Sequence, residues 1–356
     1  MDEEDVPVIS NHLERFFSGD SRFIYREAVG LGSSASAHRV QYVEKLNGHH
    51  FVTDFLVKVS PKQGWAAETI KEERTYLKLL RGGMHVVRLI DIPDDPLNKY
   101  NFQDEWSFLI MEWLPNGTLA QFVRKARNMG LQRLPNRLLW RFFLCLIRGC
   151  CSMAWPKKRE DDVLELEIPM EKRQETICHG DLHHGNVVLG DFEMTGEHQL
   201  TPILKLIDFG NSSKTEDIVA ANKENLFDVG KLMLKLITLN NETFPGPAHN
   251  PRKIKHDGQF IETLAHPILP PSHGEPSPFP WHDEWLVDVV ALCIVVDSAH
   301  QPSLEEFVTW AVQAVNERDA AYYGTPNETD VALMDLCKRT ILYAPTVNAL
   351  TENSSD

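Results

Sequence analysis

The chain has 356 residues, of which 42% are hydrophobic and 24% charged, a composition that permits a sizeable core and excludes a disordered chain. Acidic residues outnumber lysine and arginine by 51 to 36, and the formal charge of -15 disfavours nucleic acid and anionic membranes as partners. The acidic residues 1–5 are unlike a targeting signal, and the longest apolar run, 289–296, is far short of the roughly 20 residues of a membrane helix. We therefore expect a cytoplasmic or nuclear protein.

The first part of the chain predicts a small antiparallel sheet with one helix. Residues 22–60 alternate in short runs rich in β-branched and aromatic side chains, which is typical of strands. Apolar residues at helical spacing predict an amphipathic helix over 65–80, ended by Gly82 and its neighbours. Two further strands are expected at 85–92 and 106–113.

The second part predicts a mainly helical structure. The expected helices cover 119–127, 137–154, 226–239, 285–296 and 304–316. The second of these is so uniformly apolar that it should be buried, and residues 186–209 predict strand, loop and strand. The charged stretch 157–175 is expected to be a surface insertion, and the proline-rich stretch 245–280 a rigid loop. The six cysteines have no zinc-type spacing and are expected to be reduced core residues.

Polar residues that can carry chemistry stand at the ends of apolar strands. In the segment 177–189, a carboxylate, Asp181, precedes a carboxamide, Asn186, on one loop. A second carboxylate, Asp208, follows an apolar strand and precedes the turn residue Gly210. Oxygen donors of these kinds hold magnesium, so Asn186 and Asp208 are predicted metal ligands, whereas Asp181 is predicted to accept the proton of an attacking hydroxyl.

A phosphate-binding cation is needed to complete such a site. Lys58 lies midway along an apolar strand, where an unpaired charge would be costly, and Glu73 on the following helix is its expected partner. Upstream, Gly30 and Gly32 lie in a turn between strands whose backbone could approach phosphates closely. Together these residues predict phosphoryl transfer.

These pieces, in this order, resemble the protein kinase superfamily from about residue 22 to 315. The resemblance implies an α+β, bilobal protein-kinase-like fold with a small antiparallel β-sheet lobe carrying one helix and a larger, mainly helical lobe. The implied organisation is an N-terminal extension (1–21), a small lobe (22–113), a large lobe (114–318) with the insertion near 157–175 and the proline-rich loop 245–280, and a polar tail (319–356).

The resemblance also implies cofactors and residue roles. ATP and Mg²⁺ would be the cofactors, and a protein Ser/Thr hydroxyl the expected acceptor. Lys58 would bind the α- and β-phosphates, paired with Glu73. Met111, Glu112 and Leu114 would form the hinge that binds adenine, with Met111 as the gatekeeper.

Departures from the protein kinase pattern leave alternatives open. Gly180 replaces the arginine that binds activation-loop phosphate, and His183 replaces the lysine that touches the transferring phosphate. The run from 179 to 186 is similar to the aminoglycoside and choline kinase branch of the same fold. Asn225 replaces an expected aspartate, and Gln301 a late arginine, which puts the peptide platform in doubt. A small-molecule kinase and an ATP-binding pseudokinase scaffold are therefore the alternatives.

A metallohydrolase was the remaining alternative, with His179, His183 and His184 beside Asp181 as zinc ligands. It would leave Lys58 unexplained. We expect His179 instead to be a buried, hydrogen-bonded brace of the loop.

Overall fold

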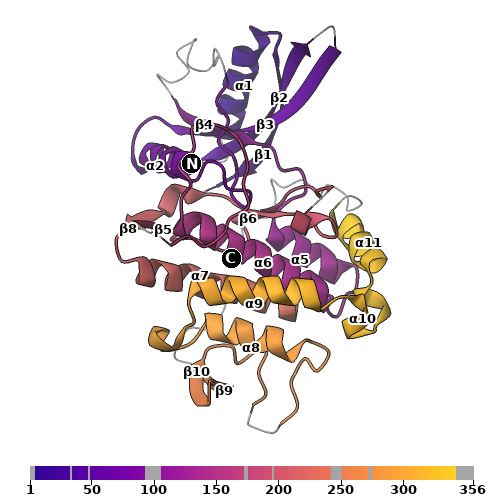
Figure 1. Cartoon of the computed structure of the whole chain (residues 1–356). Coiled ribbons are helices and arrows are strands. Elements are labelled where there is room, and N and C mark those ends of the chain that lie inside the picture. The colour runs from indigo at the N-terminus through magenta and orange to yellow at the C-terminus, as the bar shows by residue number, and fades with distance from the viewer. Residues whose placement is uncertain are drawn as a thin grey trace.

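The protein has a mixed α+β architecture, with a four-stranded antiparallel sheet at one end and most helices at the other (Figure 1). The computed structural model describes residues 5–32, 34–46, 49–92, 106–171, 175–194, 196–241, 251–271 and 275–341. Two hydrophobic clusters fill it, one between the sheet and the N-terminal helix and a larger one through the helical part.

The sheet has the strand order β1-β2-β3-β4, and the strands predicted within residues 22–60 and at 106–113 are confirmed. Its strands are β1 (Phe23–Leu31), β2 (Ser36–Leu46), β3 (His49–Pro61) and β4 (Trp106–Glu112). Successive side chains of a strand point to opposite faces. Val57 and Val59 are therefore buried in the sheet's own cluster, while Lys58 between them faces the other way.

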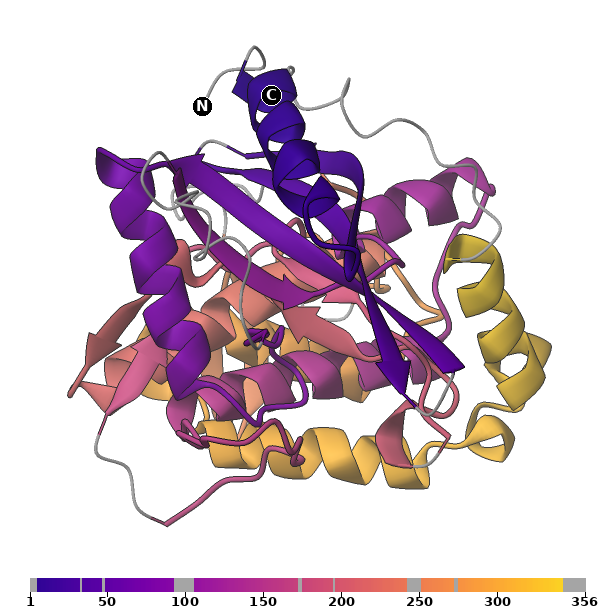
Figure 2. The same ribbon diagram turned by 90° about the horizontal axis from the view of Figure 1, so that it is seen from above.

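A helix that was not predicted covers the sheet. α1 (Asp5–Ser18) lies within the stretch expected to be an N-terminal extension, and Figure 2 shows it crossing the sheet. Its side chains Ile9, Leu13 and Phe17 are almost completely buried in the cluster between α1 and the sheet. The N-terminal stretch is thus part of the sheet's hydrophobic core.

The predicted helix after the sheet is confirmed as α2 (Trp65–Leu79). The strand expected at 85–92 is wrong. Val86 and Leu89 form only isolated bridges, to Leu206 and Met111 respectively. The segment divides its backbone hydrogen bonds between two separate strands, so no continuous ladder forms.

The helical part is built around one buried helix, α6, as predicted for 137–154. Its helices are α5 (Leu119–Asn128), α6 (Asn136–Ala154), α7 (Ile218–Thr238), α8 (Glu284–Cys293), α9 (Leu304–Glu317), α10 (Ala320–Tyr323) and α11 (Asp330–Ile341). Its short strands are β5 (Thr176–Cys178), β6 (Val187–Leu189), β7 (Leu204–Leu206), β8 (Ser213–Thr215), β9 (Arg252–His256) and β10 (Gln259–Thr263). Short 3₁₀ turns are η1 (Gly196–His198), η2 (Phe209–Asn211), η3 (Ser298–His300) and η4 (Pro326–Glu328).

Two predictions for this part need correction. α7 begins at Ile218, earlier than the expected 226, because the Asp217 carboxylate caps it by accepting from Ala220 N at 3.0 Å. The proline-rich stretch contains the hairpin β9–β10, whose turn residues Asp257 and Gly258 both have positive φ, as an Asp-Gly hairpin turn requires. Residues 245–250 and 272–274 of that stretch lie outside the described residues.

The predicted surface insertion at 157–175 is partly buried. Glu167 is 2% exposed, and Trp155 Nε1 donates to Met170 O at 2.7 Å. The segment therefore packs onto the helical part; its residues 172–174 lie outside the described residues.

The predicted polar tail contains an ordered helix, α11, with Leu333 and Cys337 buried. Just before it, the Glu328 carboxylate accepts from Asn136 N at 2.7 Å and from Arg137 N at 3.0 Å, and so caps the start of α6. The tail is thereby part of the folded core, and residues 342–356 lie outside the described residues.

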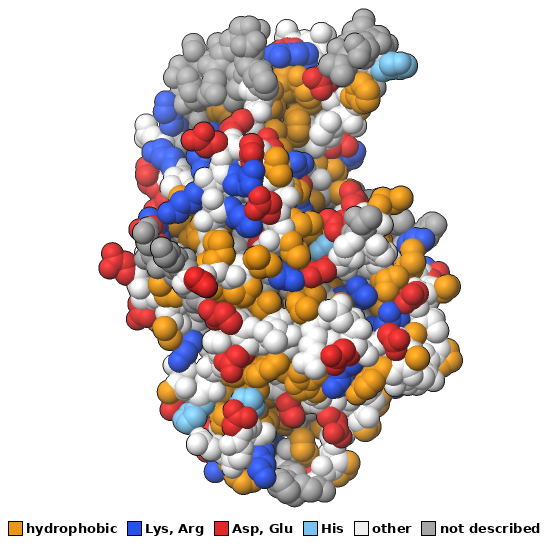
Figure 3. Space-filling view, in the orientation of Figure 1, with side chains coloured by type: hydrophobic (Ala, Val, Ile, Leu, Met, Phe, Trp, Pro, Cys, Tyr) orange, Lys and Arg blue, Asp and Glu red, His pale blue; other side chains and the backbone are white. Residues whose placement is uncertain are grey.

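All six cysteines are free and buried, as expected. Among the described residues, no helix combines the length and apolar character needed to cross a membrane. On the face shown in Figure 3, acidic and basic side chains are interspersed.

We predict that Glu328→Ala lowers the free energy of unfolding by about 1–3 kcal/mol, because it leaves the buried N–H groups at the start of α6 without acceptors. Urea denaturation measures the change, with the exposed Glu216→Ala as the control. Equal stability of the two variants would contradict the capping role of Glu328.

Candidate active site

Lys58 links the sheet to the helical part. Its Nζ lies 2.7 Å from Glu73 Oε2 and 2.7 Å from Asp208 Oδ1. The three side chains come from β3, from α2 and from the segment after β7. The structure therefore brings together the predicted lysine, its predicted partner and a predicted metal ligand.

The backbone at Asp208 is unusual. Asp208 has φ +65°, in the left-handed region that residues other than glycine seldom adopt, and it leads into the turn η2. Gly210 in η2 packs on α2 so closely that a Cβ atom there would lie 2.2 Å from Thr69 Cγ2. This contact fixes α2, and with it Glu73, against the turn that carries Asp208.

The charged groups of this cluster shift one another's pKa values. Burial opposes the charged form of Lys58, but the charges of Glu73 and Asp208 outweigh it and raise the pKa of Lys58 above its usual value. Burial would raise the pKa of Asp208 as well, yet the Lys58 ammonium holds that pKa below its usual value. Asp208 is therefore ionised at neutral pH, and its side chain is 38% exposed.

The predicted catalytic loop is braced from below. His179 is completely buried, its Nε2 contacts Ile207 O at 3.1 Å, and its ring packs on Phe209. The Asn225 carboxamide on α7 accepts from His179 N at 3.0 Å and donates to Ile177 O at 2.9 Å. The expectation that His179 is a buried brace is confirmed, and Asn225, which stands where an aspartate was expected, still holds the loop.

The loop places its polar side chains next to one another. Asn186 Nδ2 donates to Asp181 O at 2.9 Å. The amide oxygen of Asn186 is therefore the atom of this side chain that can ligate a metal ion. His183 Nε2 lies 3.7 Å from Asp181 Oδ1, and both side chains are exposed. Pairing of β6 with β7 brings Asn186 beside the residue before Asp208, because Ile207 N donates to Asn186 O at 3.0 Å.

This donor set fits magnesium. A carboxylate on Asp208 and an amide oxygen on Asn186 are hard oxygen ligands, which Mg²⁺ prefers, and few protein ligands are needed because Mg²⁺ keeps several waters. The partial exposure of Asp208 leaves room for other ligands of the ion.

The residues expected to bind adenine lie at the end of β4. Met111 is buried and pairs with Leu56, whereas the Glu112 side chain accepts from Lys205 Nζ at 2.6 Å and from Arg88 N at 2.8 Å. Lys205 was missed in the sequence, although, like Lys58, it is a lone cation within an apolar strand.

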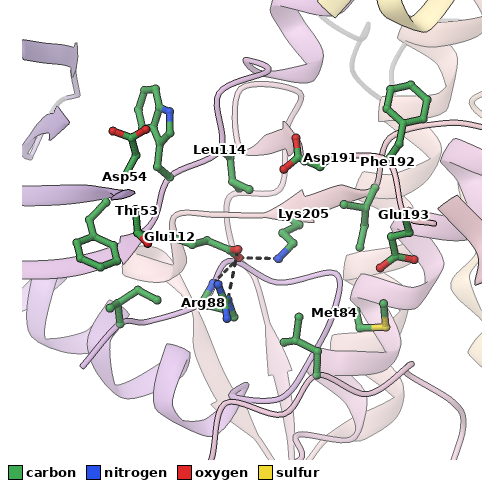
Figure 4. A pocket seen from close by; sticks show the side chains of 16 residues that line it. Thr53, Asp54, Met84, Arg88, Glu112, Leu114, Asp191, Phe192, Glu193 and Lys205 are labelled. Atoms are coloured by element: carbon green, nitrogen blue, oxygen red, sulfur yellow. Dashed lines mark hydrogen bonds and ion pairs between the residues drawn. The ribbon is translucent and has the colours of Figure 1, made fainter. Parts of the chain in front are cut away.

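A pocket of about 280 Å³ opens beside this ion pair (Figure 4). Glu112, Leu114 and Lys205 line it. Among the described residues around it, neither Lys58 nor Asp208 takes part, so this pocket is distinct from the charged cluster.

The predicted glycine turn joins β1 to β2, but only Gly32 lies in it: Gly30, which was also expected in the turn, lies within β1 and pairs with Ala37 of β2. Gly32 N donates to Ala35 O at 2.8 Å, which closes the turn, and a Cβ added at Gly30 would meet no described atom within 4 Å. The backbone at Gly30 is therefore uncrowded; Ser33, in the turn, lies outside the described residues.

The histidines of the loop do not gather as zinc ligands. Within the described ranges, the only group of His, Cys, Asp and Glu side chains close enough to share a metal ion is His85, Cys145 and His198. His184 instead contacts Lys235, at 3.4 Å. In comparisons with known proteins, no family model and no curated protein matches the chain.

We predict that Gly180→Ala is strongly destabilising. Gly180 has φ +75°, and a Cβ there would lie 2.4 Å from Asn211 O. Gly130→Ala is a matched control, because Gly130 has φ +77° but no described atom within 4 Å of the added Cβ. Chemical denaturation should show a loss of about 1–2 kcal/mol for the control and about 1–3 kcal/mol more for Gly180→Ala. Equal losses would show that the contact with Asn211 carries no energy.

A second prediction concerns pH. Because the pKa of Asp208 is lowered in the folded protein, its ionisation stabilises the fold above the unfolded pKa of about 4, and this is lost as the pH falls through the folded pKa. The stability difference between the wild type and Asp208→Asn should therefore be largest at neutral pH and shrink below about pH 4. Urea denaturation across this range measures it, with the exposed Asp335→Asn as the control. A difference that grows as the pH falls would contradict the account.

Proposed function

We propose that the protein is an ATP- and Mg²⁺-dependent phosphotransferase that transfers the γ-phosphoryl group to a hydroxyl. The observation that carries the proposal is the contact of one lysine ammonium with both Glu73 and Asp208, at 2.7 Å each. A buried cation beside an ionised, partly exposed carboxylate is suited to holding phosphate oxygens next to a metal ion.

Each residue of the site has a role in this proposal. Lys58 binds the α- and β-phosphates, and Glu73 holds its ammonium in place. Asp208 and the amide oxygen of Asn186 would hold Mg²⁺, which would neutralise charge on the phosphates. Asp181, which is exposed, orients the acceptor hydroxyl and takes its proton. His183, close to Asp181, reaches toward the transferring group.

We further propose that the α+β architecture is of the bilobal protein-kinase-like kind. In its support, the four-stranded sheet and α2 lie at one end of the molecule and most helices at the other (Figure 1). The charged cluster joins Lys58 of β3 to Asp208 after β7, and the loop with Asp181 and Asn186 runs between β5 and β6 of the helical part. Nucleotide would then bind between the glycine turn and the loop, with the end of β4 beside adenine.

The acceptor that the resemblance implies is a protein Ser/Thr hydroxyl. One observation favours the second candidate, a small hydroxylated metabolite. The segment after Gly210 is short and fully used, because β8 pairs with β5 and α7 begins at Ile218. It offers little surface on which an extended peptide could lie. A pseudokinase scaffold is disfavoured, because Lys58, Asp181, Asn186 and Asp208 are all retained.

We predict that two substitutions that remove a carboxylate charge distinguish nucleotide binding from phosphoryl transfer. Asp181→Asn should keep the thermal stabilisation by Mg²⁺-ATP, which amounts to about 2.7 kcal/mol at a hundredfold excess over the dissociation constant. It should lose transfer of labelled γ-phosphate to the acceptor. Asp208→Asn should lose both, because it removes a metal ligand.

Transfer should be measured with protein and metabolite acceptors in parallel, and thermal shifts with ATP in the presence and absence of Mg²⁺. Equal loss of nucleotide binding in both variants would overturn the assigned roles. Absence of any thermal shift in the wild type would overturn the proposed function itself.

A further inference from the structure

We propose that His85, Cys145 and His198 form a buried zinc site, separate from the phosphotransfer site. The side chains come from the segment between α2 and β4, from α6 and from η1, and all three residues are at most 2% exposed. One ligand atom from each lies within 4.8 Å of the other two.

The spacing is close to that of a tetrahedral zinc site. With Zn–S near 2.3 Å and Zn–N near 2.0 Å, tetrahedral geometry places sulfur and nitrogen roughly 3.6 Å apart. Cys145 Sγ lies 3.7 Å from His198 Nδ1, and the rings of His85 and His198 meet edge to face with centroids 5.0 Å apart. A small inward movement would bring these three ligand atoms to zinc-binding distance, with the fourth tetrahedral position left for a water molecule.

Unpartnered ring nitrogens are the second observation. His85 Nε2, the nitrogen left for a metal, is buried without a hydrogen-bond partner among the described residues, and so is the outer nitrogen Nε2 of His198, whose Nδ1 faces Cys145 Sγ. An unpartnered polar atom in a protein interior costs free energy, and a bound ion would remove that cost for the nitrogen that ligates it.

Glu167 provides the outer contact that such sites use. Its Oε2 lies 2.7 Å from His85 Nδ1, and its Oε1 accepts from His85 N at 2.8 Å. A carboxylate on the far nitrogen of a ligating histidine fixes the ring and its tautomer, leaving Nε2 for the metal. Glu167 is thus a positioning residue. Its contact with His85 explains why this part of the 157–175 segment is buried.

The donor set selects the class of metal. Two imidazoles and a thiolate are the ligands of zinc and related transition metals, whereas Mg²⁺ and Ca²⁺ prefer oxygen. The charges also balance, because a thiolate and the Glu167 carboxylate together neutralise a divalent ion in an interior that tolerates no net charge.

The site would brace the proposed active site from behind. Leu206 N donates to His85 O at 2.9 Å, and Leu206 is the last residue of β7, just before Asp208. An ion at His85 would therefore tie α6, η1 and the Glu167 segment to β7, the strand that leads to Asp208. This inference does not depend on the proposed function.

The test begins with zinc analysis of the untagged full-length protein, purified without chelator, by inductively coupled plasma mass spectrometry. We expect equimolar zinc. Cobalt added to the chelated protein should produce the sulfur-to-cobalt charge-transfer band and the strong visible bands of tetrahedral Co²⁺. Chelation should also lower the melting temperature, because the ion links segments distant in the sequence.

Cys145→Ser and His198→Gln should lose zinc and the charge-transfer band. Cys150→Ser, a buried cysteine on the same helix, is the matched control and should keep both. Glu167→Gln should weaken zinc binding by about 10–100-fold while keeping the charge-transfer band at high cobalt.

A wild type that contains no zinc and gives no charge-transfer band with cobalt would overturn the proposal, and the cluster would then be a hydrogen-bonded one only. Zinc retained equally in Cys145→Ser, His198→Gln and the Cys150→Ser control would overturn it too.

Discussion

The structure depends on one buried ammonium. Lys58 is enclosed between Glu73, which is fully buried, and Asp208, so a cation taken from water is balanced by two carboxylates. Breaking such a buried pair is costly because it leaves an uncompensated charge. α2 must therefore dock against β3, and the turn after β7 must approach from the helical side. The ion cluster, together with the ion pair of Lys205 on β7 with Glu112 on β4, thus helps to set the position of the sheet relative to the helices.

The helical part holds the other half of the site through neutral contacts. Asn225 on α7 bonds the backbone of Ile177 and of His179, and Ser212 Oγ donates to His179 O at 3.1 Å. Gly180 fits against Asn211 where no larger residue could. The loop with Asp181 is therefore rigid at its base, while Asp181 itself remains exposed. A rigid loop with an exposed carboxylate is the arrangement that proton transfer to a positioned base requires.

Much of this could be predicted because the signals are local. The strands of 22–60, α2 and α6 follow from hydrophobic periodicity, and Lys58 is conspicuous as a charge in an apolar strand. Features that depend on contacts distant in the sequence could not be predicted. α11 is held by the burial of its apolar side chains, and Glu328, just before it, caps α6 from far along the chain. The cluster of His85, Cys145 and His198 could not be predicted either, because the three residues are far apart in the sequence and form no metal-binding motif. The hairpin at Asp257-Gly258 had a turn signal, which the surrounding prolines obscured.

The central claim is that Lys58 and its partners bind the phosphates of a nucleotide. Calorimetric affinities for Mg²⁺-ATP and for adenosine in the wild type and in Lys58→Met/Glu73→Gln test it most directly, since the double substitution leaves neither member of the buried pair charged and alone. The account predicts that the variant binds ATP at least about tenfold more weakly, or about 1.4 kcal/mol, with unchanged affinity for adenosine. Equal affinity of wild type and variant for ATP would contradict it.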